Sequence, residues 1–63
     1  MSDNTMLIMA ERVRTACLEA ARSAYEDADI RGLCADGRWE CAVEAMRDLD
    51  LGLIIQSEPG EFP

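Results

Sequence analysis

Apolar side chains recur every three or four residues along the first half of the chain. From residue 5 to residue 28 this spacing is typical of a helix with one buried face. The second half of that face is mostly alanine, so a neighbouring helix can approach closely while little apolar area is buried per residue. We therefore predict a helix over about residues 5–28, capped at Asn4 or Thr5, that requires a partner surface. Its apolar positions are Met6, Met9, Ala10, Val13, Ala16, Cys17, Ala20, Ala21, Ala24 and Ala28.

A second helix is predicted over about residues 38–50, because one side of this segment is apolar and the other is charged. Trp39 is the only tryptophan of the chain. Its large apolar side chain predicts an anchor in the core between the two long helices; the alternative is an exposed contact for another protein. The apolar side of this helix carries Trp39, Ala42, Val43, Met46 and Leu49.

The segment between the helices predicts a compact connection. Acidic residues from 26 to 29 would lie at the negative end of the first helix dipole, which predicts that this helix ends there. We expect Ile30 to fold back onto the helices, Gly32 to permit the turn of the chain, and residues 31–35 to form a single helical turn. Asp36 is expected to cap the second helix.

Residues 51–55, LGLII, follow the second helix as an apolar run. The β-branched pair Ile54 and Ile55 predicts an extended arm or one strand, which packs on its own subunit or crosses to a second one. Residues 57–63 are polar and contain proline, which predicts a flexible tail. The predicted architecture is thus one all-α domain, residues 1–56: a small helical hairpin or three-helix domain with an apolar C-terminal arm.

Charge and size exclude several classes of function. The 63 residues include thirteen acidic residues and six arginines, with neither lysine nor histidine, and the net charge is −7. The chain therefore lacks an imidazole base, a Ser–His or Cys–His pair and a Schiff-base lysine. Its charge opposes nucleic-acid binding, and no apolar run is long enough for a membrane span. A core this small rarely yields more than roughly 3–5 kcal/mol, which predicts self-association as a dimer.

Three cysteines, Cys17, Cys34 and Cys41, predict reduced thiols and a cytoplasmic protein, because their number is odd and no secretory signal precedes them. Their spacing contains no CxxC pair, so neither a metal site nor a cofactor is predicted. Arg31 and Arg38 lie near Cys34 and Cys41 in the sequence, and a nearby cation favours a reactive thiolate.

Two stretches resemble known families. Residues 37–46, GRWECAVEAM, resemble the turn and second helix of a tetratricopeptide repeat, where a glycine turn precedes an aromatic residue and then small and apolar positions. This resemblance implies helix–turn–helix packing. Roughly residues 11–51 are similar to short, uncharacterised bacterial helical proteins labelled acetyltransferase, through AYEDA at 24–28, GLC at 32–34 and GRWE at 37–40. That similarity implies a compact helical protein encoded beside a larger enzyme.

The leading interpretation is a non-catalytic, self-associating module that binds or regulates another protein. One alternative is a thiol-based or acyl-transfer accessory enzyme that uses Cys34 or Cys41. Another is an acidic mimic of nucleic acid that occupies a basic protein. The side chains expected to contact a partner are Leu18, Tyr25, Leu33, Trp39 and Ile54.

Overall fold

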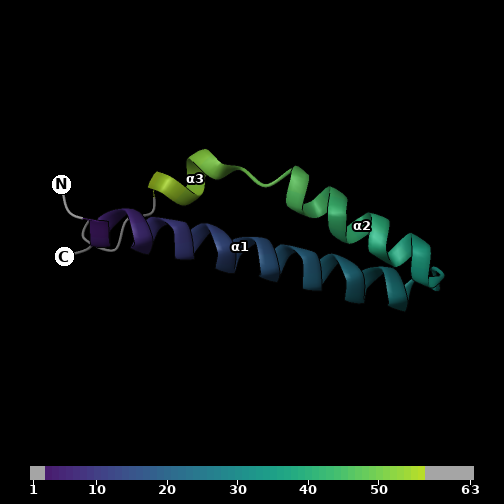
Figure 1. Ribbon diagram of the computed structural model, residues 1–63. Coiled ribbons are helices and arrows are strands. Elements are labelled where there is room, and N and C mark those ends of the chain that lie inside the picture. The colour runs from purple at the N-terminus through teal and green to yellow at the C-terminus, as the bar shows by residue number, and fades with distance from the viewer. Residues whose placement is uncertain (1–2, 57–63) are drawn as a thin grey trace.

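Over its described residues, the protein consists of one long helix with two shorter helices packed along it. The computed structural model describes residues 3–56. Helix α1 spans Asp3–Ile30, α2 spans Ala35–Arg47 and α3 spans Leu51–Gln56. The chain turns back after α1, so α2 lies along its second half and α3 along its first half, and α2 and α3 do not contact each other (Figure 1). The predicted all-α architecture is confirmed.

The alanine face of α1 packs against α2. Ala28 of α1 is 0% exposed and Ala42 of α2 is 3% exposed, and no other residue in the described part of the chain is fully buried. Small side chains at these positions let the two helices approach closely, as the alanine pattern predicts. The same alanine pattern leaves the contact between α1 and α2 with almost no apolar core, because alanine buries little apolar area. Most of the predicted face is half-buried, whereas Met6 and Ala10 are exposed.

Helix α1 continues two residues past its predicted end. Its acidic residues are compensated by arginines: Asp27 Oδ2 lies 3.1 Å from Arg31 Nε, and Asp29 Oδ1 lies 3.3 Å from Arg38 Nη1. Gly32 then ends the helix with a φ of 87°, in the left-handed region that glycine adopts without strain.

Backbone hydrogen bonds close this end of α1. The Gly32 amide donates to the Asp29 carbonyl at 2.9 Å, and the Leu33 amide donates to the Ala28 carbonyl at 3.0 Å. This pair of bonds is the Schellman arrangement, which satisfies the last carbonyls of a helix. The prediction that Ile30 folds back onto the helices is wrong, because Ile30 is 84% exposed.

Helix α2 begins earlier than predicted, directly after a short link. Residues 31–34 form a turn and an extended connection, so the predicted helical turn over 31–35 is wrong. Cys34 occupies the N-cap position without a side-chain cap bond, and Asp36 lies in the first turn of α2 rather than at its cap. Its negative charge still lies at the favourable end of the helix dipole.

The apolar run after α2 is a short helix, so the prediction of an extended arm or strand is wrong. Asp50 explains the difference: its Oδ1 accepts a hydrogen bond from the Leu53 amide at 3.2 Å, which caps the start of α3. Within residues 3–56, none of the helices is both long enough and apolar enough to cross a membrane. The predicted tail, residues 57–63, lies outside the described residues.

Candidate interaction surface

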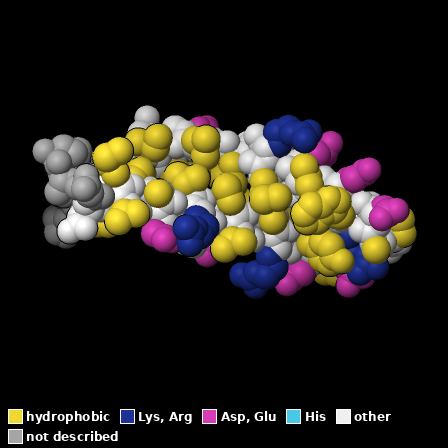
Figure 2. Space-filling model, viewed as in Figure 1, with side chains coloured by type: hydrophobic (Ala, Val, Ile, Leu, Met, Phe, Trp, Pro, Cys, Tyr) yellow, Lys and Arg dark blue, Asp and Glu magenta, His cyan; other side chains and the backbone are white. Residues whose placement is uncertain are grey.

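The candidate site is an apolar surface shared by α1 and α2. Leu18 and Tyr25 are seven residues apart, so they lie along the same side of α1. Together with Trp39 of α2 they line one shallow hollow. All three are exposed, Leu18 at 63%, Tyr25 at 38% and Trp39 at 60%. Figure 2 shows hydrophobic side chains gathered in a band along the molecule, with charged side chains at its borders.

The floor of the hollow is built from small residues. Ala21 and Ala42 line it between the larger side chains, and Arg22 and Glu26 complete the lining. The hollow therefore has an apolar interior and one charge of each sign, a composition found where one protein surface meets another. We call the surface formed by Leu18, Ala21, Tyr25, Trp39 and Ala42 the Trp39 face.

Arg38 fixes the position of Tyr25 and of the turn. Its Nε donates to the Leu33 carbonyl at 3.2 Å, and its Nη1 pairs with Asp29 at 3.3 Å. The guanidinium carbon lies 5.6 Å from the centroid of the Tyr25 ring, within the range of a cation–π interaction. One side chain of α2 thus joins the end of α1, the connecting turn and the Trp39 face.

The predicted role of Arg38, as a neighbour of a reactive cysteine, is not the one that the structure gives it. In the sequence, Arg38 is 9 positions from Asp29 and 13 positions from Tyr25. The spacing rules that apply within one helix therefore could not reveal these contacts. The nearest signal in the sequence was its place directly after the glycine turn and before the only tryptophan.

The prediction that Trp39 anchors the core is wrong, since α2 turns Ala42 toward α1 and leaves Trp39 60% exposed.

Three of the five predicted contact residues, Leu18, Tyr25 and Trp39, meet at one hollow. Leu33 lies instead at the turn, where a Cβ on Gly37 would come within 3.2 Å of its Cδ2. Ile54 is half-buried and lines a separate groove between α1 and α3.

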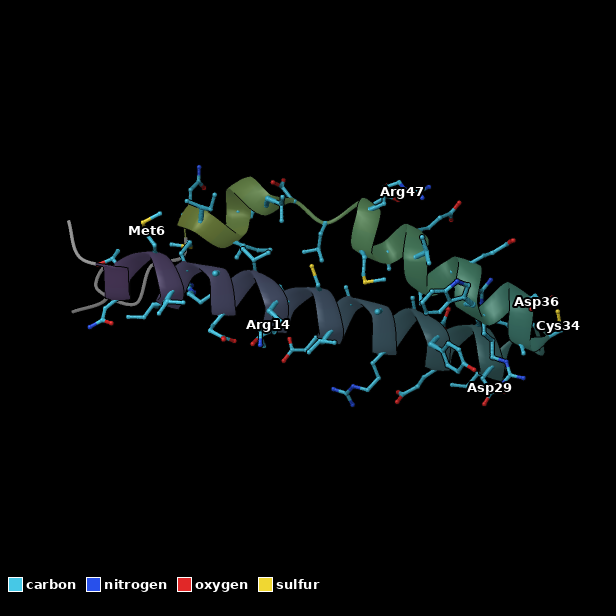
Figure 3. The ribbon with its side chains drawn as sticks, in the orientation of Figure 1. Met6, Arg14, Asp29, Cys34, Asp36 and Arg47 are labelled. Atoms are coloured by element: carbon cyan, nitrogen blue, oxygen red, sulfur yellow. The ribbon has the colours of Figure 1, made fainter. Side chains whose placement is uncertain are left out.

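None of the three cysteines lines the hollow of the Trp39 face. Arg31 Nη2 approaches Cys41 Sγ at 4.0 Å, and the same guanidinium pairs with Asp27. Cys34 is exposed at the turn end of the molecule, beside Asp36 and opposite the end that carries Met6 (Figure 3). Among residues 3–56, no group of three cysteine, aspartate or glutamate side chains is placed to hold a metal ion.

No protein-family model, curated protein or solved structure matches the chain. The resemblances to the tetratricopeptide repeat and to the proteins labelled acetyltransferase therefore stay predictions.

Proposed function

We propose that the protein is a non-catalytic, self-associating interaction module that binds protein through the Trp39 face. The observation that carries this proposal is the 60% exposure of Trp39 beside a hollow floored by alanine. Tryptophan and tyrosine are enriched at the energetic centres of protein interfaces, where they bury large apolar areas in pockets of the partner. Here Trp39 and Tyr25 line one hollow of this chain, where a partner could cover both side chains.

The small core supports the same proposal. Fully burying a leucine or phenylalanine side chain contributes about 1.5–3 kcal/mol, and no large side chain of the described residues is fully buried. Ordering each residue of the backbone costs roughly 1–2 kcal/mol. A partner that covers the Trp39 face would supply the missing apolar burial, so binding and stability are expected to be coupled.

Photo-crosslinking tests the proposal inside the cell that makes the protein. With Tyr25→p-benzoylphenylalanine, which keeps an aromatic ring on the face, irradiation is expected to produce a covalent adduct with protein. The matched control, Ser23→p-benzoylphenylalanine, places the same probe at an exposed position on another side of α1 and should give far less adduct. Absence of any adduct from Tyr25, with itself or another protein, would contradict the proposal.

Two specific observations favour the thiol-based alternative. Cys34 lies exposed at the N-cap of α2, and Cys41 has Arg31 within 4.0 Å; a helix N-terminus and a cation are both settings of reactive thiols. For the interaction module we expect alkylation by iodoacetamide to follow exposure, with Cys34 labelled first and no site faster than an unstructured cysteine peptide. Mass spectrometry measures the three rates. Labelling of Cys34 or Cys41 well above the peptide rate would favour the enzyme instead.

A further inference from the structure

We infer that the occupant of the Trp39 face is a second copy of this chain, and that two copies pair about a two-fold axis into a four-helix bundle. The bundle would consist of α1 and α2 from each copy, with the Trp39 faces turned inward. This inference rests on the proposed function, because it names the partner of the same surface. Three features of the molecule favour a second copy over a different protein.

The first feature is the single layer formed by α1 and α2. A helical layer becomes stable when a second layer covers its apolar side, and two hairpins covering one another is a known solution, the four-helix bundle. In the described chain, the contact between α1 and α2 fully buries two alanines and nothing larger. A second layer over the apolar side of α1 and α2 is therefore needed whenever the chain is folded. A second copy is present wherever the chain is made, whereas a different protein must be made alongside it.

The second feature is the shape of the Trp39 face. A two-fold interface joins one surface patch to an identical patch, so the patch must contain both a projection and a recess that receives it. Trp39 projects into solvent, and the hollow beside it has the small side chains of Ala21 and Ala42 as its floor. Rotation about a two-fold axis can bring Trp39 of each copy into the hollow of the other.

The third feature is the charge around the face. A basic partner would be favoured if the carboxylates of this chain, with its net charge of −7, covered the face. Instead the hollow is lined by one arginine and one glutamate, Arg22 and Glu26. Further along the same side of α1, Glu11 and Arg14 pair with each other at 3.5 Å. The face is thus close to neutral, which suits an apolar contact between like copies. Added salt should strengthen the pair by screening the charges elsewhere.

Dilution of the unmodified protein tests the inference. At high concentration, light scattering is expected to give twice the chain mass of 7.0 kDa, and Trp39, the only tryptophan, should emit as a buried indole. On dilution the mass should halve while the emission moves to longer wavelength, because the indole becomes exposed. A coincident change in both signals would place Trp39 in the contact between copies.

Variants make the test specific to the face. Trp39→Ala should raise the dissociation constant at least about 100-fold, because each dimer loses two aromatic contacts. Leu18→Gln should raise it by about tenfold or more, with little effect on the isolated chain, since Leu18 is 63% exposed there. Ile30→Ala is the matched control: it truncates a large exposed side chain on another side of α1, and the dissociation constant should not change.

Three results would overturn the inference. One is a mass of 7.0 kDa at every concentration together with a Tyr25 adduct to a different protein, which would exclude self-association but leave the proposed binding of protein through the Trp39 face standing. Another is a dimer whose Trp39 emission does not respond to dilution. A third is a dimer weakened equally by Ile30→Ala and Leu18→Gln. If Trp39→Ala does not fold, dilution of the unmodified protein and Leu18→Gln still decide.

Discussion

Replacing Ala42 by glutamate is expected to abolish the helical fold. Ala42 is 3% exposed at the contact between α1 and α2, where two helices approach through alanine side chains. A carboxylate at this position would lose its hydration and force the helices apart; an uncompensated buried charge costs about 3–5 kcal/mol. That loss equals the roughly 3–5 kcal/mol that a single core of this size supplies. Circular dichroism should therefore show a large loss of helix at 25 °C.

The same substitution at Ala35 is the control for this result. Ala35 is exposed and is the first residue of α2, where a carboxylate interacts favourably with the helix dipole. Ala35→Glu should thus leave the helix content unchanged and raise the free energy of unfolding by about 0.3–1 kcal/mol. A cooperative thermal transition in Ala42→Glu, near that of the unmodified chain, would show that α1 and α2 are not packed as described.

Removing the Arg38 side chain is expected to lower the free energy of unfolding by about 2 kcal/mol. Its charged hydrogen bond to the Leu33 carbonyl contributes about 1.5–3 kcal/mol, and its interaction with the Tyr25 ring about 0.5–1 kcal/mol. The ion pair with Asp29 adds less, because the Asp29 side chain is largely exposed. These terms are not additive, since one guanidinium makes all three contacts. Denaturant unfolding of Arg38→Ala measures the loss.

Two further arginine variants separate this role from the effect of charge alone. Arg14→Ala removes an equal charge from an exposed pair with Glu11, and should cost less than about 0.5 kcal/mol. Arg38→Lys keeps the charge and loses the flat guanidinium with its Nε donor, so an intermediate loss is expected. Equal stabilities for Arg38→Ala and Arg14→Ala would mean that the contacts between α1, the turn and α2 contribute nothing.

The observed helix boundaries depend on side chains that lie outside the helix concerned. The acidic residues near the end of α1 predict an early end when they are unpaired; Arg31 and Arg38 pair with them, and α1 continues to Ile30. The β-branched pair within residues 51–56 predicts an extended segment, but Asp50 accepts a hydrogen bond from the Leu53 amide and caps a helix there. The sequence does contain a signal for this cap, since an aspartate before an apolar run is a known start signal for a helix.

The candidate site was predictable in part. Leu18 and Tyr25 are among the partner contacts that the sequence predicts, and their spacing of seven residues puts them on one side of α1. The apolar spacing also put Trp39 and Ala42 on one side of α2, but it could not say which of the two would face α1. The closest approach of the helices decided this, because the buried position admits an alanine and excludes an indole. Trp39 was thereby left exposed, and the proposed binding surface follows from that exposure.

The sequence by itself determined that this protein is helical, where its two long helices lie, and that they meet through small residues. These properties depend on spacing and side-chain size within each helix, which are local and can be read along the chain. The tertiary structure alone decided that Trp39 is exposed, that Arg38 joins α1, the turn and Tyr25, and that Leu18, Tyr25 and Trp39 border one hollow. Each of these depends on how α2 is rotated and seated against α1, and that arrangement is set by packing between residues far apart in the chain.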